Sequence, residues 1–364
     1  MGNRKKNIMI LIGSLVLGGA ERQAVQLAKH LPKDKYNVFI VLYRNFIDYK
    51  EIMSEPGVKV VVIPKKTKLS ATFVYKLRKF IKSNKIDILH SYMMNTNFWA
   101  RIMGLLTRVK VIVSVRNTNI GSGYCLMNSF LGNKHSYTVF NSQSAKKEYM
   151  RTVLIKNKKR LKVIHNGLDL SHFNKPLLRT RSSSLVVGMI AKVKKQKNHL
   201  CLFKAIRLMT EQERSQLKFL CVGRTIDREL AAKLQAYAGK YDMNVKFLPG
   251  REDILSVYQS LDLVILPSLY EGFPNVVMEA MAMGLPVIAS DVSDNDLLVK
   301  EGVNGFLFKN DDPDDLKKKL ITFIDMDKQK REQMGKEGKR IIEQFDIKKM
   351  VRSTEKLYLS LLSE

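Results

Sequence analysis

The sequence predicts an α/β protein with two doubly wound parallel-sheet domains that face one cleft. The chain has 364 residues, more than one hydrophobic core usually supports. Short β-branched runs alternate with helical patterns, which is typical of parallel sheets joined by right-handed crossovers. The alternation stops over residues 174–184, a basic, Ser-rich stretch without periodicity, and then restarts. We therefore expect an N-terminal domain over residues 1–178 and a second domain over residues 179–345.

The first domain opens with a strand and a helix. Residues 8–12 form an apolar run typical of a buried strand, and apolar residues recur with helical spacing from Ala24 to Leu31. The further strands expected in this domain are 38–43, 58–63, 86–90, 109–115, 136–140 and 161–164, and the further helices are 72–83, 98–106 and one that starts at Ser144.

The second domain repeats this rhythm. Its expected strands are 185–190, 218–222, 245–247, 263–266, 286–289 and 305–308, and its expected helices are 199–209, 227–241, 253–260, 275–283, 294–300 and a long pattern over 314–345. Residues 346–364 are expected to form a C-terminal helix that packs back on the N-terminal domain. Because ligands of parallel sheets bind beyond the carboxyl ends of the strands, we expect the chemistry at strand-to-helix turns.

The charge of the chain is unusual although its composition is ordinary. Apolar residues make up 45% and charged residues 27%, which excludes a disordered chain and a disulfide scaffold. The formal net charge is +29, and the first 180 residues hold 33 Lys and Arg against 8 Asp and Glu. The remaining residues hold 30 against 26. This asymmetry predicts a polyanionic partner for the first half, either an anionic membrane or a nucleic acid.

Cysteine usage and the start of the chain indicate a cytoplasmic protein. Cys125, Cys201 and Cys221 are widely spaced and form no C-x-x-C string, so neither a disulfide framework nor a zinc site is expected. The basic and then apolar start resembles a signal peptide, but no cleavage-site pattern follows it. No run reaches about 18 uninterrupted apolar residues, the length that spans a bilayer.

Two turns carry candidate ligand-binding residues. Gly18 and Gly19 lie between the first strand and the first helix, where glycines allow phosphate to approach a helix N-terminus. A plain tight turn is the alternative. In the second domain, Glu271 follows a strand and Glu279 lies eight residues later in a helix. A carboxylate beside the N–H groups of a helix start can bind sugar hydroxyls and phosphate oxygens, whereas the alternative for Glu279 is a solvated or salt-bridged position.

The spacing of these two glutamates resembles the E-x(7)-E pattern of glycosyltransferase family 4, the retaining, nucleotide-sugar-dependent enzymes of GT-B fold. Four further segments resemble family motifs in the family's order and extend the resemblance over nearly the whole chain. They read GGAERQAVQLAKHL, VIHNGLDLSHF, VGMIAKVKKQKNHL and FLPGREDILSVYQSLDLVILPSLYEGFPN.

The resemblance implies roles for individual residues. Lys197 matches the Lys that holds the donor diphosphate, and Lys192 stands where the family has Arg, so a bidentate phosphate contact is lost. Glu279 matches the residue that holds the ribose hydroxyls, and Glu271 matches the one near the donor sugar. Further substrate contacts are implied for Gly18, Gly19, Gly250, Arg251, Gly272, Phe273, Pro274 and Asn275.

A second departure concerns the acceptor side. Many relatives carry a His after the strand equivalent to 109–115, where this chain has Arg116 and Asn117. Neither side chain is a general base near neutral pH. In a front-face retaining mechanism the departing phosphate oxygen can take the acceptor proton, and Arg116 would stabilise the leaving diphosphate. His90 is an alternative acceptor-site residue, and a structural role for it stays open.

No metal cofactor is expected. Asp-x-Asp strings start at Asp294, Asp312 and Asp325, but each lies near an expected helix end, where Asp serves as a cap. The expected donor is a nucleotide sugar, a UDP-sugar in preference to a GDP-sugar.

The basic half favours a membrane over a nucleic acid. Its cationic clusters are not interleaved with aromatic residues as a stacking platform requires, and no nucleic-acid-binding module pattern occurs. Lys and Arg near an anionic bilayer contribute about 1 kcal/mol each. The helix over 72–83 carries apolar and cationic sides, which fits an interfacial helix or a core-facing stripe equally well. We therefore expect peripheral association with the inner face of the cell membrane and no nucleic-acid partner.

Together these features predict a retaining glycosyltransferase. It would move a hexose or N-acetylhexosamine from a nucleotide sugar to a lipid-linked glycan in surface polysaccharide synthesis. The alternatives are a catalytically inactive GT-B-fold binding protein, suggested by Lys192 and the missing His, and a basic nucleic-acid-binding protein. The order of the motifs argues against an epimerase or a phosphorylase of the same fold.

Overall fold

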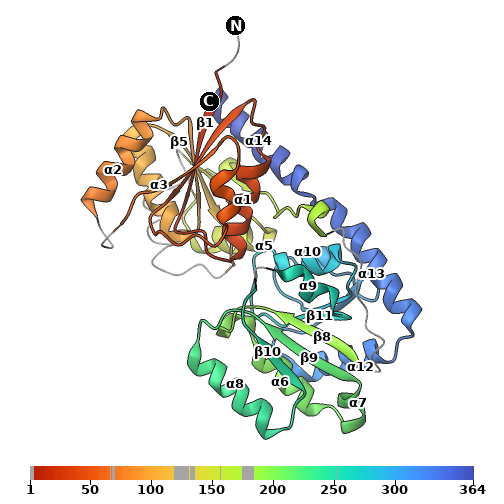
Figure 1. Cartoon of the computed structure of the whole chain (residues 1–364). Helices are drawn as coiled ribbons and strands as arrows, with labels where there is room; N and C mark the ends of the chain where they lie inside the picture. Colours follow the sequence, from red (N-terminus) through yellow and green to blue (C-terminus); the bar gives the residue numbers. More distant parts are fainter. Residues whose placement is uncertain are drawn as a thin grey trace. The chain divides into compact units, whose positions relative to one another are not determined.

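The computed structural model describes residues 4–118, 131, 136–173 and 184–364, apart from positions 66, 68, 69, 156 and 252. The chain divides into two compact units, Met1–Gly167 with Ile347–Glu364 (unit 1) and Leu168–Asp346 (unit 2). Each unit contains one parallel sheet with helices on both faces, which confirms the expected α/β class (Figure 1). The boundary lies after Gly167 and not at residue 178, because Leu168 pairs with Asp346 of unit 2.

The sheet of unit 1 has the order β3-β2-β1-β4-β5-β6-β7. Its strands are β1 (Lys6–Ile12), β2 (Tyr36–Leu42), β3 (Val58–Val62), β4 (Ile88–Tyr92), β5 (Lys110–Val115), β6 (Ser136–Phe140) and β7 (Leu161–Val163). Its helices are α1 (Gly19–His30), α2 (Ala71–Ser83), α3 (Met94–Thr107), α5 (Gln143–Thr152) and α14 (Ile347–Ser363). The helix expected over 98–106 starts four residues earlier than the sequence pattern indicated.

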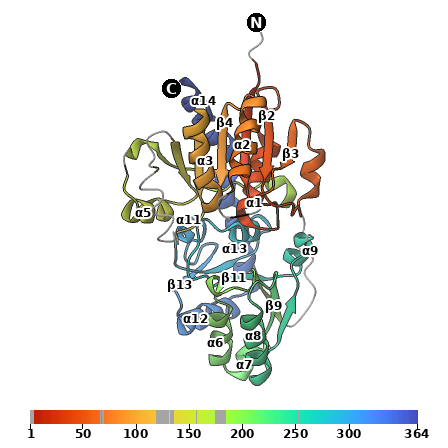
Figure 2. The same ribbon diagram turned by 90° about the vertical axis from the view of Figure 1, so that its left-hand side faces the viewer.

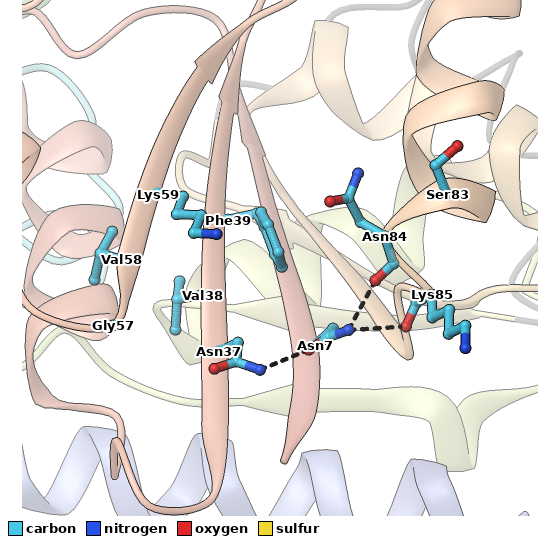
Figure 3. Close-up of a pocket in the computed structure, with 10 residues that line it drawn as sticks. All are labelled: Asn7, Asn37, Val38, Phe39, Gly57, Val58, Lys59, Ser83, Asn84 and Lys85. Atoms are coloured by element: carbon cyan, nitrogen blue, oxygen red, sulfur yellow. Dashed lines mark hydrogen bonds between the residues drawn. The ribbon is translucent and has the colours of Figure 1, made fainter. Parts of the chain in front are cut away.

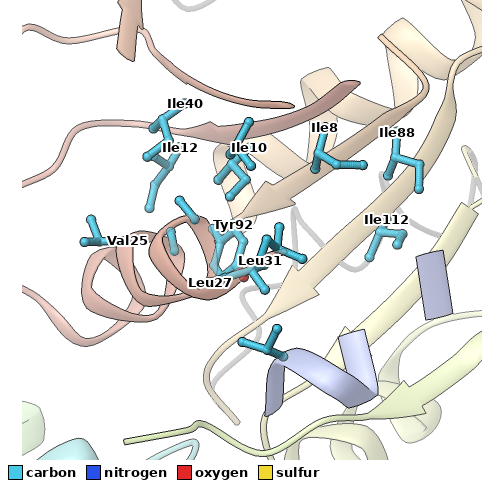
Figure 4. Close-up of a cluster of buried hydrophobic side chains, with 14 of the residues drawn as sticks. Ile8, Ile10, Ile12, Val25, Leu27, Leu31, Ile40, Ile88, Tyr92 and Ile112 are labelled. Atoms are coloured by element: carbon cyan, nitrogen blue, oxygen red, sulfur yellow. The ribbon is translucent and has the colours of Figure 1, made fainter. Parts of the chain in front are cut away.

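Two apolar layers hold these helices on the sheet. Ile8, Ile10 and Ile12 of β1 point to the face covered by α1 and α14, as Figure 4 shows for the cluster around them. Met9 and Leu11 point to the opposite face, which α2 and α3 cover (Figure 2). Because both faces are covered, the whole run from Ile8 to Ile12 is buried, as a parallel strand requires.

Helix α2 uses its apolar side for the core. Phe73, Leu77 and Ile81 are buried against the sheet, which decides between the two readings of this helix in favour of a core-facing stripe. Its outer side is cationic and carries no carboxylate, and Tyr75 on that side is 64% exposed.

A cavity of about 420 Å³ lies at the amino-terminal edge of the sheet of unit 1 (Figure 3). The starts of β1, β2 and β3 and the end of α2 line it. Asn7 Nδ2 donates to the carbonyl oxygen of Asn84 at 2.7 Å, and Asn37 Nδ2 donates to Asn7 Oδ1 at 2.9 Å. This edge is opposite to the carboxyl ends of the strands, where the candidate residues of unit 1 lie.

The sheet of unit 2 has the order β10-β9-β8-β11-β12-β13. Its strands are β8 (Leu185–Ile190), β9 (Leu217–Val222), β10 (Val245–Leu248), β11 (Leu263–Leu266), β12 (Val287–Ser290) and β13 (Gly305–Phe308). Its helices are α6 (His199–Leu208), α7 (Glu211–Ser215), α8 (Arg228–Lys240), α9 (Ile254–Gln259), α10 (Asn275–Ala282), α11 (Asn295–Leu298), α12 (Pro313–Ile324) and α13 (Lys328–Ile342). Helices α6, α8 and α12 cover one face, and α9 and α10 cover the other.

The helical pattern over 314–345 is two helices and not one. Asp327 starts α13 by accepting a hydrogen bond from the backbone N–H of Lys330 at 2.8 Å, and Asp312 caps α12 through Asp315 N at 3.0 Å. The capping role expected of the Asp-x-Asp strings is thus confirmed for these two. It is wrong for Asp294, whose side chain makes no cap hydrogen bond to α11.

His90 lies in the core of unit 1, where it is 3% exposed. Its Nδ1 is 2.8 Å from the hydroxyl of Tyr358 in α14, and its Nε2 is 2.9 Å from Ser114 Oγ in β5. Burial, and to a lesser extent the charge of Arg116, lowers the pKa of His90 from 6.5 to about 3. Since both ring nitrogens are engaged inside the protein, the geometry favours the structural role for His90 over substrate contact.

The neutral form of His90 makes the stability of unit 1 depend on pH. The unfolded chain takes up a proton on this ring below pH 6.5, whereas the folded state resists it down to about pH 3. Stability is therefore complete above pH 6.5 and falls below it, by up to about 1.4 kcal/mol per pH unit. We expect His90→Gln to flatten the decline of the free energy of unfolding between pH 6.5 and 4.5. The exposed His172→Gln should leave that slope unchanged, and equal slopes in all three proteins would contradict this account.

Candidate active site

Glu271 and Lys197 meet at the carboxyl edge of the sheet of unit 2. Glu271 lies in the turn between β11 and α10 and is 8% exposed, and Lys197 lies after β8. The ammonium group of Lys197 forms an ion pair with Glu271 Oε1. Strands β8 and β11 are neighbours in the sheet, and the order of strands reverses between them. The pair therefore lies at the topological switch point, where parallel sheets bind ligands.

The turn that carries Glu271 is held from two sides. Gln196 accepts a hydrogen bond from Leu269 N through its backbone oxygen at 2.9 Å, and its side-chain Nε2 donates to Tyr270 O at 2.7 Å. From β12, Ser290 Oγ donates to the carbonyl oxygen of Ser268 at 2.6 Å. These contacts fix the backbone on both sides of the carboxylate, so the turn is a rigid platform.

Three lysines share the neighbourhood of this one carboxylate. Burial lowers the pKa of Lys194, the charges of Lys197 and Lys192 lower it further, and Glu271 acts in the opposite direction. Lys194 is therefore half-buried in the site and not part of a solvated basic loop. The three lysines outnumber this carboxylate, and an excess of cations attracts anions.

Glu279 is buried inside α10. It is 4% exposed, and its Oε2 accepts a hydrogen bond from the hydroxyl of Tyr258 in α9 at 2.8 Å. The solvated position considered for Glu279 is therefore wrong. A carboxylate accepts hydrogen bonds through both of its oxygens, and hydroxyl groups are suitable donors to it.

The residues around the start of α10 include a buried aromatic ring and the polar N-terminal end of the helix. Phe273 is 3% exposed, and its ring centroid is 5.0 Å from that of Phe345. Pro274 occupies the N-cap position, and Asn275 is the first helical residue. The positive end of the helix dipole thus lies in the same turn as Glu271 and Gly272. Arg251 is exposed and lies beyond the carboxyl end of β10.

The glycine loop of unit 1 is shaped by a buried carboxylate. Gly18 is the N-cap of α1, and Gly19 is the first residue of the helix. A Cβ atom at Gly18 would collide with the carboxylate of Glu21, which is 8% exposed. A side chain at Gly18 would therefore require the end of the Glu21 side chain to move, and phosphate binding by this loop stays a prediction.

Arg116 extends from the carboxyl end of β5. Its guanidinium carbon is 4.7 Å from the centroid of the Tyr92 ring, and Nη1 donates to Asn166 Oδ1 at 2.9 Å. Burial lowers its pKa from the ordinary value. Within the described part of the chain it forms no ion pair, and its buried Nε lacks a hydrogen-bond partner. Asn117 follows it and is half-buried.

The sequence missed two side chains of the site region. Tyr258 lies inside one of the motif segments, but nothing local signals its contact with Glu279, because that contact joins two helices through the fold. His199 lies two residues after the loop over residues 192–197, which we call the lysine loop, and it is 1% exposed. Burial lowers its pKa to about 4. It is therefore neutral at physiological pH. Cys201 and Cys221 are buried free thiols, and Cys125 lies outside the described residues.

Comparisons with known proteins define the class of this chain. Residues 17–172 match the family model "Glycosyltransferase Family 4", and residues 173–341 match "Glycosyl transferases group 1". The two models together span nearly the whole chain, in the order that the motifs indicated. The chain therefore belongs to the glycosyltransferases of the family 4 type.

The relatives place it among hexosyltransferases. It is 27% identical to the UDP-Gal:alpha-D-GlcNAc-diphosphoundecaprenol alpha-1,3-galactosyltransferase of Escherichia coli, with 95% of each chain covered. It is 25% identical to a Campylobacter jejuni alpha-1,4-N-acetyl-D-galactosaminyltransferase named for a GalNAc-GalNAc-diNAcBac-PP-undecaprenol substrate, over 93% of this chain and 94% of that one. Both relatives are transferases of hexose-type sugars, and the chain is accordingly a hexosyltransferase.

Solved structures confirm the fold. Anabaena Alr3699/HepE in complex with UDP and glucose superposes with a TM-score of 0.84 at 22% identity, over 98% of this chain and all of that one. The sucrose-phosphate synthase of Thermosynechococcus elongatus gives a TM-score of 0.83 at 16% identity, over 99% of this chain and 100% of that one. The expected GT-B fold class, two Rossmann-like parallel-sheet domains, is therefore confirmed.

Proposed function

We propose that this enzyme transfers a hexose or N-acetylhexosamine from a UDP-sugar to a lipid-linked glycan, with retention at the anomeric carbon, in surface polysaccharide synthesis. The observation that carries the proposal is the Glu271–Lys197 pair beside Lys194 at the carboxyl edge of β11 and β8. The names of the two relatives support a diphosphate-linked polyprenol acceptor. The UDP bound to the structural neighbour supports a uridine donor.

The lysine loop explains how the donor diphosphate would be held. Lys197, Lys194 and Lys192 supply more positive charge than Glu271 neutralises, so a bound diphosphate restores the balance. In the described part of the chain, no group of three or more His, Cys, Asp or Glu side chains is arranged to hold a metal ion. We propose that these lysines stabilise the departing diphosphate without a metal cofactor.

The carboxylates of Glu279 and Glu271 would bind the two sugar parts of the donor. Glu279, oriented by Tyr258, would accept hydrogen bonds from the ribose hydroxyls. Glu271 would accept them from the transferred sugar, with Lys197 fixing its direction. Because neither Arg116 nor Asn117 can act as a base, the proton of the acceptor hydroxyl would pass to the leaving phosphate oxygen on the same face of the sugar. Transfer on that face retains the anomeric configuration.

Replacement of Glu271 tests the site assignment. A panel of UDP- and GDP-sugars is first ranked by thermal stabilisation of the wild type, and the best donor is used for transfer assays. We expect Glu271→Gln to lower kcat at least 100-fold, because it removes a charged acceptor aimed at the reacting sugar. The exposed Glu229→Gln, whose carboxylate pairs with Lys233 on the surface, is the matched control. Full donor turnover by Glu271→Gln would refute the assignment.

We further propose that unit 1 binds an anionic membrane surface through its cations. None of the described helices is both long enough and apolar enough to cross a bilayer. The apolar side of α2 is committed to the core, so attraction must come from the outer side, where Lys76, Lys79 and Lys82 are exposed. Peripheral binding would bring the enzyme to a lipid-linked acceptor on the inner face of the membrane.

Charge neutralisation on α2 tests membrane binding. We expect wild-type protein to sediment with vesicles of anionic phospholipid at low salt and to be released as salt rises. Lys76→Gln, Lys79→Gln and Lys82→Gln combined should weaken binding at least 10-fold, because each cation contributes about 1 kcal/mol. The same change at Lys246, Lys318 and Lys336 of unit 2 is the control. Wild-type protein that stays in the supernatant at low salt would rule out the proposal.

A further inference from the structure

One serine binds both backbone polar groups of Glu271. Ser293 lies in the loop between β12 and α11. Its Oγ donates a hydrogen bond to the carbonyl oxygen of Glu271 at 2.6 Å, and the same Oγ accepts one from Glu271 N at 3.2 Å. The two bonds come from a single side chain, so the Glu271 backbone cannot shift or rotate without breaking them.

Ser293 makes these bonds from an unfavourable backbone conformation. Its φ angle is +55°, in the left-handed region that residues with a Cβ atom rarely adopt. Hydrogen bonds hold the residues on either side of Ser293. Val292 N donates to Ser290 O at 2.9 Å, and Asn295 Nδ2 donates to the same oxygen at 2.9 Å. Strained residues persist where the surrounding structure determines them, and they cluster at functional sites.

We infer that Ser293 is a positioning residue for the reaction, and that the strained loop after β12 holds the Glu271 carboxylate in the direction that meets Lys197 and the donor sugar. This inference rests on the proposed function. Glycine is the residue that accepts a positive φ without strain, but glycine offers no hydroxyl. A serine at this position is therefore explained by its bonds to Glu271 and not by the turn that it occupies.

Two substitutions separate the effect of the two hydrogen bonds from Ser293 to the Glu271 backbone, which we call the clamp, from the effect of the backbone strain at Ser293. Ser293→Gly removes the hydroxyl and relieves the strain, whereas Ser293→Ala removes the hydroxyl and keeps the strain. The control is Asp242→Gly, which relieves a comparable positive φ of +45° on an exposed turn of the same unit. Asp242 lies between α8 and β10, outside the turns that carry Lys197 and Glu271.

The two bonds from Ser293 to Glu271 predict a loss of rate in both variants and a loss of stability only in Ser293→Ala. We expect kcat to fall at least 10-fold in both Ser293 variants, because small misplacements of a reacting group cost up to about 100-fold in rate. The dissociation constant for UDP should change less than threefold. The unfolding temperature of Ser293→Gly should stay near that of the wild type and exceed that of Ser293→Ala. Asp242→Gly should keep wild-type kcat.

Two results would contradict the positioning role of Ser293. A Ser293→Gly variant with kcat within twofold of the wild type would overturn the inference. So would a loss of kcat in the two Ser293 variants that only follows the fraction of protein unfolded at the assay temperature.

Hydrogen exchange keeps the inference separate from the proposed function. The amide of Glu271 donates to Ser293, so its exchange should accelerate at least 10-fold in Ser293→Gly and stay unchanged in Asp242→Gly. If the wild type transfers no sugar from any donor of the panel, the proposed function fails while this exchange rate still decides whether Ser293 restrains Glu271. An unchanged exchange rate would contradict the positioning role.

Discussion

The ion pair between Lys197 and Glu271 is the interaction on which the site of this enzyme depends. Only 16% of the lysine side chain and 10% of the glutamate side chain are exposed. Burying two charges costs desolvation free energy that their attraction offsets only when the geometry is good, so such a pair adds little to stability. The pair instead fixes orientation, because each charged group holds the side chain of the other in one direction. In the proposed function, the further cations of Lys194 and Lys192 would meet the anionic donor.

The topology of unit 2 brings these charges together. The lysine loop follows β8, the Glu271 turn follows β11, and the Ser293 loop follows β12, which are three consecutive strands of one sheet. In a parallel sheet the carboxyl ends of such strands share an edge, and the strand order reverses between β8 and β11. Side chains that are about 75 and 100 residues apart in sequence therefore converge without any special local structure. The hydrogen bonds from Gln196 and Ser293 then fix the turn between them.

Much of the fold and part of the site could be predicted from the sequence. Alternating β-branched runs and helical patterns are local signals, and they placed Glu271 after a strand and Glu279 inside a helix correctly. Contacts between distant elements have no local signal. The bond from Tyr258 to Glu279, the clamp from Ser293 and the enclosure of His90 by Tyr358 all depend on how helices and loops pack. The break between α12 and α13 was missed because its Asp caps lie within a continuous amphipathic pattern.

A double-mutant cycle on the ion pair tests this account most directly. Lys197→Met, Glu271→Gln and the double variant are compared by kcat/KM for transfer from the UDP-sugar that best stabilises the wild type. If the two side chains act as one unit, the double variant will lose little more than the worse single variant, which corresponds to a coupling free energy of about 1–3 kcal/mol. Losses that multiply, with a coupling near zero, would show that the two charges act independently and would contradict the central role of the pair.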